Sequence, residues 1–362
     1  MPDGSAPSPE RRVHLAFASA ALPLLDELRR VFPGSRHAAR SAYSCESDLA
    51  PEDAALEASL AFATQSLPAA EAVVAPSVKK WVSAILDRMG ERLDEIEGPV
   101  RLHVYRVGPA SSDPVPRRCR LIEEDLRARL HKKRRSLLRR LVAPDAPVSA
   151  AGEALVQAAL ETPDAGLVSI ATPGVRHRLR RTISRFPAGL VRVAADRRPP
   201  SRAFRKLLEA EAHLGRPIAS GERCVDLGAS PGSWSFVALE RGASVVAVDR
   251  SPLRDDLMSH ERVTFVEGDA FRFEPENPPA DWLLSDVVAF PRRIVDLAGR
   301  WLGEGLCRRF VLTMKFRGSA DYPVIESLKS VLALFGAEFQ VRQLLENKNE
   351  VTAYGTARQG QG

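Results

Sequence analysis

Residues 222–250 read ERCVDLGASPGSWSFVALERGASVVAVDR, and this stretch predicts one strand–turn–helix–strand unit. The apolar run at 224–227 is typical of a buried strand, a helix is expected from the turn through Trp234 to about Arg241, and a second strand follows at 244–248. The next residue, Asp249, ends that strand. Such elements form a βαβ unit, whose ligand binds at the carboxyl ends of the strands.

The turn of this unit is Gly228-Ala229-Ser230-Pro231-Gly232. Its two glycines allow the backbone to approach a ligand closely. Pro231 has the φ angle that suits the first position of a helix, and Ser230 before it is expected as the N-cap. Gly242 is expected to end the helix.

Two cofactor classes bind in such a unit. A dinucleotide site has the pattern G-x-G-x-x-G and places a pyrophosphate at the helix N-terminus. This chain has D-x-G-x-x-P-G-x-W from Asp226 to Trp234, with Ser230 where the second glycine would stand. The carboxylate of Asp226 suits the ammonium and sulfonium of S-adenosylmethionine better than a pyrophosphate, and Asp249 can accept from both ribose hydroxyls in either case. S-adenosylmethionine is therefore the expected cofactor, with NAD as the weaker alternative.

Composition sets the class of protein. A length of 362 residues, 44% of them hydrophobic, is enough for two globular domains, and the net charge of +6 favours a polyanionic partner. The four cysteines form no C-x-x-C and no His/Cys cluster, which indicates a reducing compartment and no metal site. The start lacks an apolar signal region, and no apolar run is long enough to cross a membrane. We expect a soluble cytoplasmic protein.

The doubly wound pattern continues beyond the βαβ unit. Further strands are expected at 263–270, 282–288 and 310–316. They place Asp269, Asp286 and Lys315 near strand ends, and Asp269 is expected to accept from an adenine amino group. A helix at 322–335 and a hairpin of strands 338–345 and 350–357 complete an α/β sheet of Rossmann type.

The N-terminal half has a mixed α+β pattern. Strands are expected at 13–19, 99–107, 155–160 and 166–171, and helices at 22–32 and 77–89. Residues 1–10 are expected to be disordered and 143–153 to form a loop. The proline-bearing segment 194–200 is the expected linker, which gives domains 1–195 and 196–362.

Two basic stretches lie between residues 117 and 198. Residues 117–140 hold eleven Lys or Arg against three acids, and 176–198 hold eight arginines against one acid. The first is expected as one helix with a single apolar stripe, formed by Leu121, Leu126, Leu130, Leu137, Leu138 and Leu141. A charge run is commonly a solvated face, but two in one chain favour contact with RNA phosphates.

The strand ends, taken together, resemble the RrmJ/FtsJ-like RNA 2′-O-ribose methyltransferases, nearest to the RlmM type, which acts on a cytidine of 23S ribosomal RNA. The matching stretches are SRAFRKLLEA from Ser201, the turn DLGASPGSW, SDVV, the strand end TMK and RQLLENKNEVT. They span about 201–354 in the family's order. The resemblance implies a methyltransferase sheet preceded by a THUMP-like RNA-binding domain.

The resemblance also implies the catalytic residues. The family's Lys-Asp-Lys-Glu tetrad falls on Lys206, Asp286, Lys315 and Glu350. Removing the ribose hydroxyl proton requires a base, and Lys315 is assigned as that base or as the group that orients the hydroxyl. Asp286 would hold Lys315, and Lys206 and Glu350 would position the ribose. The sequence does not fix which protonation state of the two lysines dominates.

Departures and alternatives complete the sequence analysis. The family's Pro-Gly-Gly-Trp is Pro-Gly-Ser-Trp here, its Lys-Leu-Pro is Lys315-Phe316-Arg317, and the N-terminal half resembles the THUMP module only in layout. The N/D-P-P-Y/F turn of amine methylation and the Pro-Cys of base C5 methylation are both absent from the sequence. The main alternative is a non-catalytic RNA-binding or ribosome-assembly protein with a methyltransferase fold; a 2′-O-methyltransferase for another RNA is a second.

Overall fold

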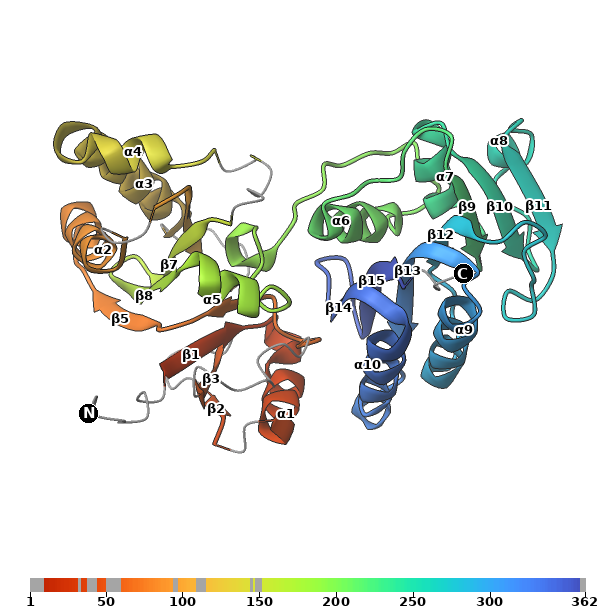
Figure 1. Ribbon diagram of the computed structural model, residues 1–362, viewed down its shortest axis with the longest axis horizontal. Helices are drawn as coiled ribbons and strands as arrows, with labels where there is room; N and C mark the ends of the chain where they lie inside the picture. Colours follow the sequence, from red (N-terminus) through yellow and green to blue (C-terminus); the bar gives the residue numbers. More distant parts are fainter. Residues whose placement is uncertain are drawn as a thin grey trace, which may run out of the picture. The chain divides into compact units, whose positions relative to one another are not determined.

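The chain divides into two compact units, Met1–Leu190 and Val191–Gly362. The computed structural model, drawn in Figure 1, describes residues 10–31, 34–37, 44–49, 60–93, 97–108, 115–143, 146 and 152–358. Residues 1–9 of the expected disordered start, and most of the expected loop 143–153, lie outside this range. The sequence predicts this boundary at residue 195, within the proline-bearing segment 194–200.

The N-terminal unit begins with a small antiparallel sheet of order β2-β3-β1-β4. Its elements are β1 (Glu10–Leu15), α1 (Ala21–Val31), β2 (Arg36–His37), β3 (Ser44–Leu49) and β4 (Gln65–Leu67). Leu24, Leu25 and Leu28 are buried at helical spacing on α1. Glu27 on the same helix is also buried, and its carboxylate accepts from the backbone N–H groups of residues 61 and 62.

A second sheet in this unit has the order β5-β8-β7-β6, with β6 and β7 parallel and the other pairs antiparallel. Its elements are β5 (Glu71–Val74), α2 (Val78–Leu93), β6 (Val100–Arg106), α3 (Val115–Lys133), α4 (Arg135–Arg140), β7 (Ala154–Thr162), β8 (Ala165–Ala171) and α5 (Pro173–Arg178). Trp81, Ile85 and Met89 of α2 share one buried cluster with Ile122 and Leu126 of α3. The second sheet and its helices therefore have a core of their own.

The expected single helix over 117–140 is wrong in two respects. The backbone leaves helical geometry at Arg134, with φ −142° and ψ 62°, and α4 starts there. The break turns the chain so that Leu137 joins the same buried cluster. The buried stripe of α3 includes Cys119 and Ile122, whereas Leu121 is 37% exposed.

No helix in the described ranges is long and apolar enough to cross a membrane.

The C-terminal unit contains a seven-stranded sheet of order β11-β10-β9-β12-β13-β15-β14. Its strands are β9 (Arg223–Leu227), β10 (Ser244–Asp249), β11 (Val263–Glu267), β12 (Ala280–Ser285), β13 (Cys307–Lys315), β14 (Gly336–Arg342) and β15 (Glu350–Ala357). Its helices are α6 (Phe204–Leu214), α7 (Ser233–Glu240), α8 (Asp255–Met258), α9 (Pro291–Gly303) and α10 (Val324–Phe335). The first five strands in the list are parallel, and β15 is antiparallel to both β13 and β14.

Helices cover both faces of this sheet: α6 and α7 lie on one face, and α9 and α10 on the other (Figure 1). Strand β9 lies between β10 and β12 in the sheet. In the chain, β10 is the next strand after β9, and β12 is the third strand after it. The strand order therefore reverses at the β9/β12 pair, and ligands of open α/β sheets bind beyond the carboxyl ends of the strands at such a point. The expected doubly wound sheet with a terminal antiparallel hairpin is confirmed.

Candidate active site

The glycine turn lies at the reversal point. Gly228 follows β9 directly, has φ +75°, and donates its N–H to the carbonyl of Val248 at 2.8 Å. A Cβ at this position would lie 2.5 Å from the Cβ of Val287, which follows β12. Gly232 has φ +104°, and its Cβ would lie 2.4 Å from a methyl group of Leu257. Both glycines are therefore required by the backbone and by close packing, independently of any ligand.

The expected N-cap of α7 is wrong. The cap is Gly232, and the helix begins at Ser233, after the left-handed glycine, rather than at Pro231. Ser230 instead connects the turn to the end of β10: its hydroxyl donates to the Pro252 carbonyl at 2.9 Å, and its N–H donates to Asp249 Oδ2 at 3.0 Å. The expected end at Gly242 agrees with the structure, where Gly242 has φ +84° just after the helix.

Asp249 and Asp269 lie at neighbouring strand ends. Asp249 is half-buried, and its second oxygen accepts from the N–H of Ser251 at 3.0 Å. Asp269, two residues beyond β11, accepts from the N–H of Phe271 at 2.9 Å and forms ion pairs with Arg250 and Arg293. The backbone N–H, assisted by the two arginines, holds the pKa of Asp269 below its usual range. Both carboxylates are thus fixed in orientation.

Asp226 and Trp234 are buried instead of facing the carboxyl edge. Asp226 is 2% exposed, and its Oδ2 accepts from the hydroxyl of Ser235 at 2.7 Å. Burial raises the pKa of Asp226 to about 7, although its hydrogen bonds to Ser235 act in the opposite direction. The indole of Trp234 is also buried, and its N–H donates to the carbonyl of Ala203 at 2.8 Å. Trp234 therefore anchors the start of α6, which carries Lys206.

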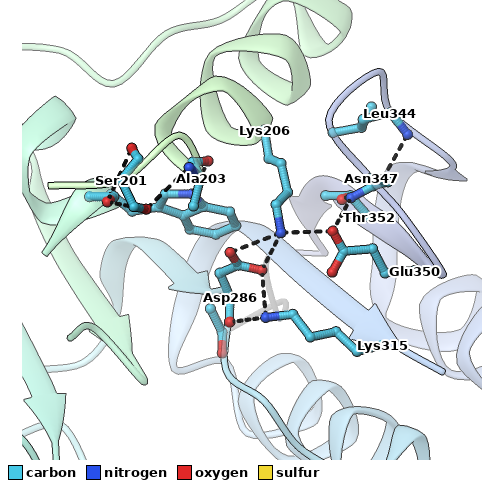
Figure 2. Close-up of polar contacts among 12 residues, drawn as sticks. Ser201, Ala203, Lys206, Asp286, Lys315, Leu344, Asn347, Glu350 and Thr352 are labelled. Atoms are coloured by element: carbon cyan, nitrogen blue, oxygen red, sulfur yellow. Dashed lines mark hydrogen bonds and ion pairs between the residues drawn. The ribbon is translucent and has the colours of Figure 1, made fainter. Parts of the chain in front are cut away.

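The four tetrad residues form one connected cluster (Figure 2). The ammonium of Lys206 lies 2.8 and 2.9 Å from the two carboxylate oxygens of Asp286 and 2.9 Å from Glu350 Oε1. Lys315 Nζ lies 3.0 Å from Asp286 Oδ1 and also donates to the backbone carbonyl of Asp286. Residues that are 144 positions apart in the sequence (206 to 350) thus meet in one network.

The fold explains this convergence. Asp286 directly follows β12, Lys315 ends β13, and Glu350 begins β15. In the antiparallel pair of β13 and β15, Lys315 lies directly opposite Glu350. Lys206 is on the first turn of α6, which packs on the same face of the sheet as α7. Two parallel strand ends, one antiparallel strand start and one helix therefore bring the four side chains together.

Burial and charge differ between the two lysines. The side chain of Lys206 is 9% exposed and that of Lys315 is 22% exposed, the largest fraction in the tetrad. Burial alone would lower the pKa of Lys206, but the carboxylates of Asp286 and Glu350 outweigh it and raise that pKa. Lys206 is therefore a charged ammonium at neutral pH, and Lys315 is the lysine more open to a substrate.

Sequence analysis missed a residue that orients the tetrad. Asn347 Nδ2 donates to Glu350 Oε1 at 3.1 Å, while its Oδ1 accepts from the N–H of Leu344 at 2.7 Å and from the hydroxyl of Thr352 (Figure 2). The sequence places this asparagine in the hairpin connection and in the family-matching stretch RQLLENKNEVT, without a role of its own. An asparagine three residues before the tetrad glutamate, Glu350, was the available signal.

The order of the strands, the antiparallel hairpin and the polar cluster at the reversal point define a methyltransferase-type α/β domain. Comparison with known proteins agrees with this class of domain. Residues 199–352 match the model of the FtsJ-like methyltransferase family. The resemblance stated from the sequence is confirmed over these residues, and it supports S-adenosylmethionine as the cofactor.

The matching relatives have names that are more specific than the family description. The ribosomal RNA large subunit methyltransferase M of Azoarcus sp. (strain BH72) is 35% identical over 184 residues, which are 48% of this chain and 50% of the relative. The protein of the same name from Azotobacter vinelandii is 38% identical over 182 residues, 47% and 51% of the two chains. The chain thus spans about half the length of the curated relatives it matches.

The similar solved structures match this chain with low TM-scores. TrmN from Thermus thermophilus covers 96% of this chain and 99% of its own at 16% identity, with a TM-score of 0.33. A fibrillarin pre-rRNA processing protein from Methanococcus jannaschii covers 43% of this chain and 76% of its own, also at 16% identity, with a TM-score of 0.32. The assignment of the fold therefore rests on the strand order of the C-terminal unit.

Proposed function

We propose that this protein transfers a methyl group from S-adenosylmethionine to a ribose 2′-hydroxyl of RNA, with a cytidine of 23S ribosomal RNA as the target. The observation that carries the proposal is the Lys206–Asp286–Lys315–Glu350 cluster. It lies at the carboxyl edge of the sheet, next to the glycine turn. The name shared by the relatives supports ribosomal RNA as the substrate class.

The aspartates at the strand ends beside the glycine turn fit the cofactor. S-adenosylmethionine, when bound, supplies a methyl group on a positively charged sulfur. Each oxygen of Asp249 accepts one backbone N–H, so a carboxylate with about four acceptor sites keeps two for the ribose hydroxyls. Asp269 at the next strand end is the candidate acceptor for the adenine amino group. Asp226, buried against Ser235, acts through the turn and not by direct contact.

The tetrad prepares the acceptor hydroxyl. Lys206 is held between Asp286 and Glu350 and contributes a fixed positive charge. Lys315, the most exposed of the four, orients the hydroxyl oxygen, and in its neutral amine form it takes up the hydroxyl proton and becomes the ammonium that Asp286 holds. Asp286 holds both lysines, and Glu350, oriented by Asn347, completes the network around the ribose. Much of the rate comes from such positioning, because oxygen, methyl carbon and sulfur must be in line.

The N-terminal unit is proposed to bind the RNA, as a THUMP-like domain would. Several cations of the first basic stretch are already paired within α3: Arg120 with Glu124, Arg127 with Glu123, and Arg129 with Asp125. Others are exposed to solvent, namely Arg117, Lys132, Arg135 and Arg139. In the second stretch, Arg178 and Arg180 of this unit are exposed. The exposed Arg192, Arg197 and Arg198 of the same stretch lie at the start of the C-terminal unit, where Arg198 pairs with Asp196 and Glu240. Exposed cations of this kind contact phosphates.

A ribosomal RNA substrate also implies a cytoplasmic location.

One experiment separates this function from the alternatives. Mapping 2′-O-methyl marks on 23S ribosomal RNA from cells with and without the gene should show one mark lost. An RNA fragment containing that nucleotide should then be methylated by the purified protein, and its 2′-deoxy counterpart should not. Methylation of the deoxy fragment would identify a base atom as the acceptor. No transfer to any ribosomal RNA or precursor particle would favour the assembly-protein alternative.

A further inference from the structure

An exposed aromatic side chain lies close to the tetrad in the chain and stacks on a cation. Phe290 ends the loop that begins at Asp286, and its side chain is 57% exposed. The guanidinium carbon of Arg317, two residues beyond Lys315, lies 4.1 Å from the centre of its ring. Val288 in the same loop is 85% exposed. We call Phe290 and Arg317 the stacking pair.

The backbone on both sides of the stacking pair is fixed. Phe290 is the N-cap residue of α9 and has extended backbone angles, with Pro291 as the first residue of the helix. The N–H of Arg317 donates to Asp321 Oδ2 at 2.8 Å. Its neighbour Phe316 is buried and packs edge-on against Tyr322, with ring centres 5.1 Å apart. Local contacts therefore hold the backbone on both sides, and the side chains of Phe290 and Arg317 are both exposed.

The chemistry of the stacking pair matches an unpaired nucleobase. Single-stranded RNA is bound mainly by stacking its bases on aromatic rings and on arginine planes. The ring of an exposed phenylalanine forms no favourable contact with water, whereas stacking against the flat face of a base buries the ring. Arg317 also brings a positive charge for the neighbouring phosphate. Aromatic and guanidinium surfaces together, next to a ribose-handling cluster, favour RNA over an apolar protein partner.

We propose that Phe290 and Arg317 stack the base of the nucleotide whose ribose is presented to Lys315. The proposal rests on the proposed function, because it names how that substrate is held. Phe290 and Arg317 are thus positioning residues for the acceptor. A stacked base fixes the sugar attached to it, so the pair acts on the orientation of the 2′-hydroxyl and takes no part in proton transfer. It also requires an unpaired target nucleotide.

The first test uses methyl transfer to an unmodified 23S ribosomal RNA transcript. Phe290→Ala should lower kcat/KM by about 5- to 100-fold, the loss expected for one stacked base. Phe290→Trp should keep activity near wild type, and Phe290→Leu, which keeps apolar volume but no ring, should behave like the alanine variant. Leu334→Ala is the matched control, because Leu334 is 61% exposed near the end of α10. Equal activity of the leucine variant and wild type would overturn the proposal.

The second test is independent of catalysis. The indole of Phe290→Trp should lose fluorescence when oligocytidylate is added, relative to wild type. A base-free ribose-phosphate oligomer of equal length should not cause this loss. Quenching by both oligomers, or by neither, would overturn the stacking. If the wild type transfers no methyl group and only oligocytidylate quenches, the proposed function fails while the stacking surface stands.

Discussion

Asp286 binds two lysines with one carboxylate: both of its oxygens lie within 2.9 Å of the Lys206 ammonium, and Oδ1 lies 3.0 Å from Lys315 Nζ. Lys206 also has Glu350, so its charge is compensated twice, while Lys315 shares its carboxylate with Lys206. The two lysines are therefore not equivalent. Lys206 is a structural cation of the site, and Lys315 has the less compensated and more exposed amine.

This difference gives the first prediction. Lys315→Ala should lower methyl transfer by at least about 100-fold, the scale of general acid–base catalysis, with cofactor affinity and melting temperature close to wild type. Lys206→Ala should lose activity and also about 1–3 kcal/mol of stability, because it leaves Glu350 buried without its cation and Asp286 with Lys315 alone. Lys329→Ala, on α10, is the control for losing a lysine. Full activity of the Lys315 variant would rule out its assigned role.

The second prediction concerns the cofactor. Asp249→Ala should weaken S-adenosylmethionine binding by about 1.5–3 kcal/mol, measured by calorimetry, because hydrogen bonds to a charged acceptor are lost. Asp249→Asn should weaken it less, since the amide keeps one acceptor oxygen. Asp281→Ala, on β12 near the opposite edge of the sheet, serves as the control. NAD binding more tightly than S-adenosylmethionine to the wild type would contradict the cofactor assignment.

The C-terminal fold was predictable because its signals are local. Each parallel strand contains a short apolar run and ends at, or directly before, a charged residue or a glycine, so the strand ends were visible before the structure. Ser230 shows the limit. A serine before a proline reads as a helix cap, but the backbone needs the left-handed Gly232 first, and the serine instead bonds the Pro252 carbonyl. That choice depends on packing against a loop distant in sequence.

Long-range contacts also explain what was missed in the site. The sequence alone could not show that Trp234 points at Ala203, or that Asp226 faces Ser235 and not the ligand edge. In α3, the charge run hid which positions are buried: Ile122 faces the core and Leu121 does not. The tetrad itself was located through the family resemblance, because no periodicity relates Lys206 to Glu350.

The third prediction tests the RNA surface of the N-terminal unit. Replacing Lys132, Arg135 and Arg139 together by glutamine should flatten the dependence of RNA affinity on salt, since each phosphate contact contributes about 0.7–0.9 to that slope. S-adenosylmethionine binding should stay unchanged. The charge-matched control replaces the exposed Arg216, Arg262 and Arg308 of the C-terminal unit. An equal slope in the two triple variants would show that the basic stretch 117–140 is a solvated face and does not contact RNA phosphates.

The last prediction follows from the buried Asp226. Burial raises its pKa from the ordinary value of 3.8 to about 7, so the folded protein holds a proton that the unfolded chain releases near pH 4. Stability from this group is complete below pH 4 and is lost as the pH rises to about 7, because the folded state then contains a buried carboxylate. Asp226→Asn keeps the shape and cannot ionise. The melting temperature of the variant minus that of the wild type should therefore increase from pH 4 to pH 7 and level off above. Each tenfold difference in proton affinity corresponds to about 1.4 kcal/mol, which makes the change measurable by calorimetry. Ser235→Ala is the companion variant: it removes the hydroxyl that donates to Asp226 and so favours the protonated carboxyl further, which should extend the loss of stability to higher pH than in the wild type. A difference that stays flat with pH for both variants would show that Asp226 does not titrate in this range.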